Sequence, residues 1–131
     1  MKTDLQDAKR ELRGYLKAYR ICQDQAEEIA RQIEKDEVLD AVREMLLQAK
    51  REFETHCRNV NLILGYLSQG STMYRVVSLR YLQGMNMKDV AGKLGYSVGH
   101  CDNVESMAID YLVSRSQVME LIGKKDRHEK K

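Results

Sequence analysis

The segment that most constrains the fold spans residues 87–106, where two short amphipathic helices are predicted to meet at a glycine. Asn86 and Ser97 each precede an apolar repeat, and their side chains can accept hydrogen bonds from the free N–H groups of a helix start. Gly95 stands between the repeats, where a chain can leave a helix through a left-handed turn. The apolar positions are Val90, Ala91, Leu94, Cys101, Val104, Ala108 and Leu112. This spacing predicts a helix-turn-helix, a unit whose second helix enters the major groove in DNA-binding proteins.

Two long amphipathic helices are predicted to precede this unit. In each, nine positions alternate spacings of three and four, which is the pattern of a coiled-coil seam. All of these positions are apolar or aromatic except His56 in the second helix. The first series is Leu5, Ala8, Leu12, Tyr15, Tyr19, Cys22, Ala26, Ile29 and Ile33, and the second is Leu39, Val42, Leu46, Ala49, Phe53, His56, Val60, Ile63 and Leu67. Because such stripes must be covered in water, they are expected to face each other or a second copy of the chain.

The connection between the long helices is predicted at residues 34–37, where the apolar pattern slips. Asp36 can cap the second helix and so produce a tight antiparallel hairpin that buries both stripes within one chain. Neither glycine nor proline marks this turn, so one bent continuous helix is the alternative.

The break at Gly70 separates the long helices from the rest of the chain. Ser71 or Thr72 can cap a third helix, which Gly84 closes. The apolar pattern also allows the last helix to continue to Ile122, where its final apolar group can pack on the long helices or join two chains.

The predicted fold class is therefore all-α. Residues 1–70 are expected to form a long, coiled-coil-like hairpin with a scaffolding or oligomerisation role. Residues 71–122 are expected to form a three-helix module that contains the helix-turn-helix. Residues 123–131 carry five basic and two acidic side chains, and we expect a basic disordered tail there.

The cysteines are expected to be buried, reduced thiols. Cys22, Cys57 and Cys101 are an odd, widely spaced set at apolar helical positions. His56 and His100 each precede a cysteine, but adjacent helical residues point about 100° apart, so neither pair converges on one metal ion. We expect no metal and no cofactor.

The sequence also bears on location and enzyme class. No apolar run approaches the ~18 residues of a membrane span, and the chain opens on a charged helix, so no membrane partner and a cytoplasmic location are expected. The sequence contains no nucleophile–base spacing, no glycine-rich phosphate loop and no carboxylate pair in a plausible pocket. We therefore do not expect an enzyme.

Residues 74–84 (YRVVSLRYLQG), followed by Val90-Ala91 and LGYS at 94–97, resemble the DNA-reading fourth region of bacterial sigma factors. The layout is more specifically similar to phage-encoded ArpU-type regulators of late genes, which pair a long charged helical N-terminus with such a module. Residues 8–12 and 15–19 resemble the opening helix of that family. The resemblance implies a transcriptional regulator of a phage or prophage, acting on double-stranded DNA in a bacterial host cell.

If the module reads DNA, outward side chains at the start of its second helix meet the base edges. The amide of Asn103 can pair with adenine at N6 and N7, His100 can donate to guanine, and Asp102 can accept from cytosine N4. The predicted base-reading set is Ser97, Val98, His100, Asp102, Asn103 and Ser106.

The sequence departs from the sigma pattern in its cations. Recognition helices of that family usually carry Arg or Lys near their start, whereas residues 97–114 contain neither. Because neutralising phosphates supplies the sequence-independent part of DNA affinity, these contacts must come from other segments. The candidates are Arg80, Lys88, Lys93, Arg115, Lys124 and Lys125.

Three functions follow from these observations. The first is a DNA-binding regulator that dimerises through its long helices and contacts half-sites about one helical turn apart or a multiple of it. The second is an interaction module that docks on RNA polymerase, a sigma factor or another phage protein, which the missing recognition-helix cations favour. The third is a packaging or scaffolding subunit of a phage.

Overall fold

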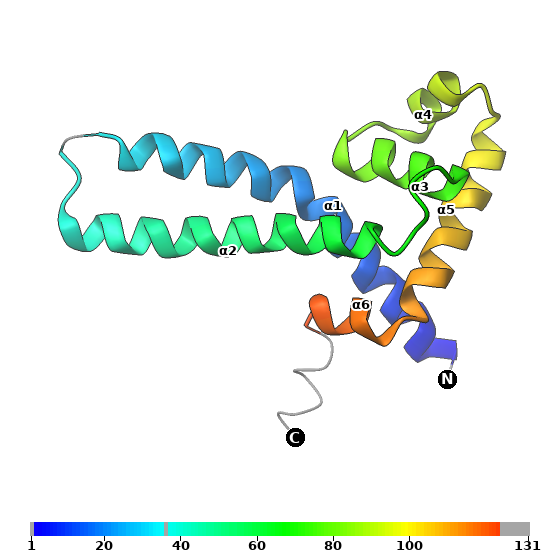
Figure 1. The fold of residues 1–131 in the computed structure, drawn as a ribbon, viewed down its shortest axis with the longest axis horizontal. Helices are drawn as coiled ribbons and strands as arrows, with labels where there is room; N and C mark the ends of the chain where they lie inside the picture. Colours follow the sequence, from blue (N-terminus) through cyan, green and yellow to red (C-terminus); the bar gives the residue numbers. More distant parts are fainter. Residues whose placement is uncertain (1, 36, 124–131) are drawn as a thin grey trace.

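The computed structural model describes residues 2–35 and 37–123, and within these ranges it contains helices and no strand (Figure 1). The all-α prediction is confirmed. The elements are α1 (Lys2–Ile33), α2 (Asp40–Leu64), α3 (Thr72–Val77), the π-helical turn η1 (Ser78–Leu82), α4 (Met87–Leu94), α5 (Val98–Val113) and α6 (Ser116–Leu121). In this described part of the chain, no helix is both long enough and apolar enough to cross a membrane.

Helices α1 and α2 lie side by side and antiparallel, forming a long arm whose base meets the other helices (Figure 1). α1 ends at Ile33 and α2 begins at Asp40, so the long helices are separate. Leu39 occupies the N-cap position of α2 without a side-chain bond, and the predicted cap, Asp36, lies outside the described residues. At the tip of the arm, Arg43 donates to the carbonyl oxygen of Ile33 at 2.7 Å.

The apolar stripes are buried at the base of the arm and exposed towards its tip. Leu12 of α1 and Val60 and Ile63 of α2 are fully buried, whereas Leu39 is 72% exposed. Leu5 was also predicted to lie in the seam, but it is 47% exposed. The first turns of α1 extend beyond the end of α2 and therefore leave that seam (Figure 1).

One core cluster joins the base of the arm to the rest of the molecule. It consists of Leu12, Leu16, Val60, Ile63, Leu64, Leu67, Val77, Tyr81, Ala108, Ile109, Leu112 and Val118. The boundary predicted at residue 70 therefore marks a turn of the chain, while the core continues across it. A smaller cluster packs α4 against α3 and α5 and contains Val76, Val90, Ala91, Cys101 and Val104.

The junction between α4 and α5 has the predicted local signals. The side chain of Asn86 accepts from the N–H of Asp89 at 2.8 Å, and that of Ser97 accepts from the N–H of His100 at 3.0 Å. Gly95 has a φ of 77°, in the left-handed region that favours glycine. These three predictions are confirmed, and together they set the sharp corner at which α5 leaves α4.

Two helix boundaries differ from the predictions. The third helix is divided, because η1 inserts an extra residue into the turn and Gln83 donates to the carbonyl of Ser78, five residues back. The last helix does not continue to Ile122; α5 ends at Val113 and a separate α6 follows. This break lets Val118 turn back and become fully buried against the arm, which is favourable for an apolar side chain.

The corner at Gly95 can be tested with a matched pair of glycine variants. Gly95→Ala is expected to lower the free energy of unfolding by about 1–2 kcal/mol, because alanine resists a left-handed φ. Gly92→Ala is the control: Gly92 is exposed inside α4 with open space around it, so alanine should raise stability by up to about 1 kcal/mol. Urea unfolding followed by circular dichroism measures both changes, and a loss of similar size in both variants would contradict the assignment.

Candidate functional site

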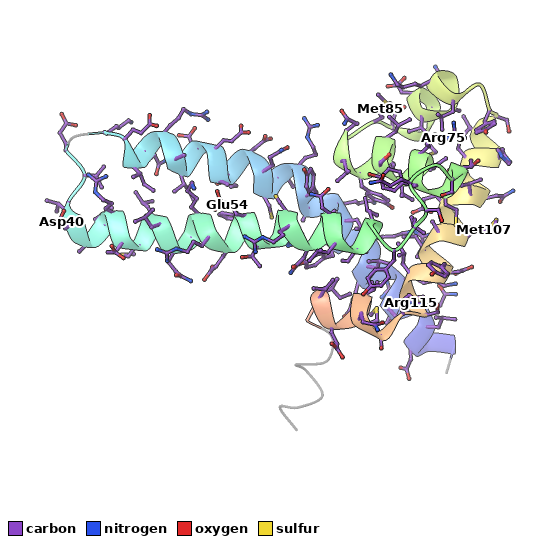
Figure 2. All side chains as sticks on the ribbon, in the orientation of Figure 1. Asp40, Glu54, Arg75, Met85, Met107 and Arg115 are labelled. Atoms are coloured by element: carbon purple, nitrogen blue, oxygen red, sulfur yellow. The ribbon has the colours of Figure 1, made fainter. Side chains whose placement is uncertain are left out.

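The N-terminal half of α5 presents an exposed face. All six predicted base-reading residues, Ser97, Val98, His100, Asp102, Asn103 and Ser106, are exposed. The opposite side of the same turns is buried through Cys101, Val104 and Glu105. The ring of His100 packs edge-on against Tyr96, with centroids 4.8 Å apart. Further along the face, Met107 points away from the molecule (Figure 2).

Glu105 belongs to the interior rather than to this exposed face. The residue is 7% exposed, and its carboxylate accepts two hydrogen bonds from Arg13 of α1, from Nε at 3.0 Å and from Nη2 at 2.9 Å. The hydroxyl of Tyr81 in η1 donates to the same carboxylate at 2.6 Å. One buried carboxylate therefore joins α1, η1 and α5.

The protonation state of this cluster follows from its geometry. Burial alone would raise the pKa of Glu105, but the hydrogen bonds from Arg13 and Tyr81 and the charge of Arg13 outweigh it and hold the pKa below its ordinary value. Burial and the bond to Glu105 raise the pKa of Tyr81, so its proton stays on the hydroxyl. The cluster is thus a carboxylate held by a cation and a neutral phenol at neutral pH.

The acidic charge of α5 is largely matched by α1. Besides the Arg13–Glu105 pair, Lys9 forms an ion pair with Asp110 at 2.7 Å. In the sequence these carboxylates are unbalanced negative charges on the predicted recognition helix. In the fold, two of them pair with cations of α1, which reduces the repulsion that they would exert on a polyanion.

A hollow of about 270 Å³ lies beside the exposed face of α5. It brings three of the predicted site residues, Arg80, Asp102 and Ser106, to one place. Arg13 and Lys17 of α1 line the same hollow. Sequence reasoning did not identify these α1 cations, although a row of basic residues at spacings of three and four was available as a signal.

Three of the predicted phosphate contacts lie on η1 and α4. Arg80 is half-buried and donates from Nη1 to the carbonyl oxygen of Met85 at 3.1 Å. Lys88 and Lys93 are exposed on α4. These three cations therefore lie on the two elements that immediately precede α5.

The C-terminal candidates lie elsewhere. Arg115 follows the far end of α5, and its guanidinium lies over the rings of Tyr66 and Tyr111 at 5.3 and 5.8 Å from their centroids. This packing gives Arg115 a structural role at the junction of α5 and α6 (Figure 2). Lys124 and Lys125 lie outside the described residues.

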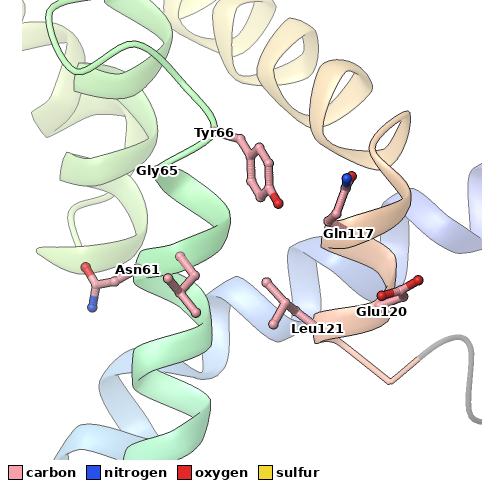
Figure 3. A pocket seen from close by; sticks show the side chains of 7 residues that line it. Asn61, Gly65, Tyr66, Gln117, Glu120 and Leu121 are labelled. Atoms are coloured by element: carbon pink, nitrogen blue, oxygen red, sulfur yellow. The ribbon is translucent and has the colours of Figure 1, made fainter.

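A second and larger hollow of about 690 Å³ lies between the end of α2 and α6. Its walls combine apolar and amide groups with one carboxylate, contributed by Asn61, Leu62, Gly65, Tyr66, Gln117, Glu120 and Leu121 (Figure 3). None of the predicted site residues is among its lining residues.

The cysteines are free thiols, and two of the three are buried as expected. Cys22 and Cys101 are buried, Cys57 is half-buried, and burial raises the pKa of all three. Over residues 2–35 and 37–123, no group of three or more His, Cys, Asp or Glu side chains is arranged to hold a metal ion.

Comparison of the chain with protein-family models, with curated proteins and with solved structures gives no match. The similarity to sigma-factor region four and to ArpU-type regulators therefore stays a prediction from the sequence.

The contribution of the Arg13–Glu105–Tyr81 cluster to the free energy of unfolding is expected to depend on pH. Glu105→Gln is expected to lower the free energy of unfolding by about 3 kcal/mol at neutral pH, because the amide removes the charge that pairs with Arg13 and one of the two acceptor oxygens. Since the pKa of Glu105 is lowered on folding, its contribution is complete above the unfolded value of about 4.3 and is lost as pH falls through the folded value. Denaturant titrations should therefore show the two proteins converging below about pH 4.

The control for this variant is Glu54→Gln. Glu54 forms an exposed pair with Lys50 at 2.8 Å within α2, and its loss should change stability by less than about 0.5 kcal/mol. If the free energies of unfolding of wild type and Glu105→Gln differ by the same amount at every pH, including the lowest, the charge of Glu105 is not the source of the effect.

Proposed function

We propose that this protein is a DNA-binding transcription regulator of a phage or prophage, acting in the cytoplasm of a bacterial host. In this proposal α3, η1, α4 and α5 form a three-helix helix-turn-helix module, and α5 enters the major groove. The observation that carries the proposal is the exposure of all six predicted base-reading residues on one helix whose other face is buried.

The start of α5 has the groups that base readout needs. Asn103 carries an amide that can pair with two atoms of one adenine, and His100 can donate to a guanine acceptor. Val98, 42% exposed in the first turn, can contact a thymine methyl group. Lys88 and Lys93 on α4 can bind phosphates beside the groove.

A protein-docking function is the second candidate. Residues 97–114 contain no Lys or Arg, and the exposed side of α5 includes the apolar side chains Val98, Met107 and Tyr111. Such a surface suits a partner such as RNA polymerase, a sigma factor or another phage protein. This candidate predicts little binding to free DNA.

A salt titration separates the two candidates. Binding of a fluorescent duplex pool should weaken steeply as salt rises if phosphates are contacted. For the duplexes selected from that pool, Asn103→Ala should cost about 1–3 kcal/mol at one base position and relax sequence choice. Lys88→Gln, the matched variant, should weaken all duplexes alike. Absence of binding at low salt would favour the docking function, and an unchanged sequence preference in Asn103→Ala would remove that residue from base readout.

We also propose that the regulator is a homodimer joined through the long helices. Leu39, Val42 and Met45 near the tip of the arm are 72%, 43% and 71% exposed, so apolar surface remains there after α1 and α2 have paired. Light scattering should give twice the chain mass of 15.2 kDa, and Met45→Glu should shift the population towards monomer. A strict monomer at micromolar wild-type concentration would contradict the dimer.

A further inference from the structure

A row of cations follows one face of α1. Arg10, Arg13, Lys17 and Arg20 are spaced by three, four and three residues, which places them on one side of a helix. This side faces the base of the molecule, because Arg13 reaches Glu105 and Arg20 reaches the backbone after η1. The row therefore lies along the junction between the arm and the module that contains α5.

Three cations from two elements surround one hollow in this junction. The hollow measures about 410 Å³ and is lined by Lys17 and Arg20 of α1 and by Arg80 of η1. Asp24 lines it as well and contributes a single carboxylate. The lining thus carries three positive charges against one negative charge.

Backbone carbonyl groups position the two arginines. Nη1 of Arg20 donates to the carbonyl oxygens of Leu82 at 3.4 Å and Gln83 at 3.1 Å, and Nη1 of Arg80 donates to Met85 at 3.1 Å. A neutral carbonyl orients a guanidinium without cancelling its charge, and each guanidinium has five N–H donors. Both groups therefore keep donors and charge available for an anion.

The contrast with other cations of α1 supports this reading. Arg10 pairs with Asp7 at 2.9 Å and Arg13 pairs with Glu105 at 2.9 Å. Among the ion pairs found over residues 2–35 and 37–123, none involves Lys17, Arg20 or Arg80. The positive charge of Lys17 and Arg20 is therefore less compensated than that of their neighbours, while the charge of Arg80 also acts on the buried carboxylate of Glu105.

The hollow is linked to the exposed face of α5 through lining residues that it shares with a smaller hollow. Lys17 lines both this hollow and the smaller one that Asp102 and Ser106 border. An anion bound by the three cations would consequently lie one hollow away from Asp102 and Ser106, at the edge of the surface that α5 presents.

We infer that Lys17, Arg20 and Arg80 form a phosphate-binding site for the DNA strand flanking the groove that α5 enters. The inference rests on the proposed function and deepens it, because it makes the arm part of the DNA-binding surface. It also accounts for how a recognition helix without Lys or Arg gains affinity. Two of the three cations come from α1, more than seventy residues earlier in the chain, and the third comes from η1.

The test uses the exposed Lys17, whose replacement leaves the backbone contacts of both arginines in place. Duplex binding of Lys17→Gln is measured over a series of salt concentrations. Loss of one phosphate contact should reduce the slope of log K against log salt by about one and lower affinity about five- to tenfold near 0.1 M salt. Lys17→Arg should retain binding, because it retains the charge.

Lys35→Gln is the matched control, since Lys35 lies in the connection at the opposite end of the arm and its loss changes net charge equally. Its slope should equal that of the wild type. Thermal unfolding of each variant establishes that the fold is retained.

The outcomes separate this inference from the proposed function. If wild type binds duplex DNA but Lys17→Gln matches it, or weakens no more than Lys35→Gln, the phosphate site is wrong and the regulator stands. If wild type binds no duplex at low salt, both fail together. A reduced slope in Lys17→Gln alone, with sequence choice unchanged, supports the site.

Discussion

The arrangement of this molecule depends on one buried carboxylate. Glu105 accepts hydrogen bonds from Arg13 and Tyr81, and these bonds join the first long helix, the π-helical turn and α5 at a single point. A buried charge is tolerated only when it is paired and fully hydrogen-bonded, so the carboxylate restricts how these elements can rotate about one another. Since α5 can present only one face to Arg13, the opposite residues, Asn103 among them, are directed to solvent. The interior contact thus determines the exterior surface.

Much of the local structure was predictable from the sequence. Asn86, Ser97 and Gly95 are signals whose physical effect is complete within four residues, and each acts as predicted. The exposure of the six residues at the start of α5 follows from the helical spacing of its apolar positions. These positions specify the buried side of the helix, so the other residues face solvent. The all-α class could be predicted from the long series of apolar spacings of three and four and from the absence of proline.

The parts that escaped prediction are those set by contacts distant in the chain. Arg13 and Glu105 are 92 residues apart, and no periodicity relates them. Leu5 and Leu39 belong to the predicted stripes but are not buried between α1 and α2, because a repeating pattern shows which side of a helix is apolar, but not where its partner helix ends. The break before α6 likewise depends on the core position that Val118 fills. The basic residues of α1 can be identified in the sequence, but only the fold shows that they lie near α5.

Helix α1 has different tasks along its length, and this limits how the chain can vary. Its early turns hold Arg13 and Lys17 against the base of the molecule, while its later turns bury Ala26 and Ile29 in the arm. Each residue added to a helix rotates everything beyond it by about 100°. A single insertion or deletion between these stretches would turn one surface away from its neighbours, whereas a seven-residue change would nearly restore the phase. Natural variants of this chain should therefore differ in the length of α1 by whole heptads, with a compensating change in α2.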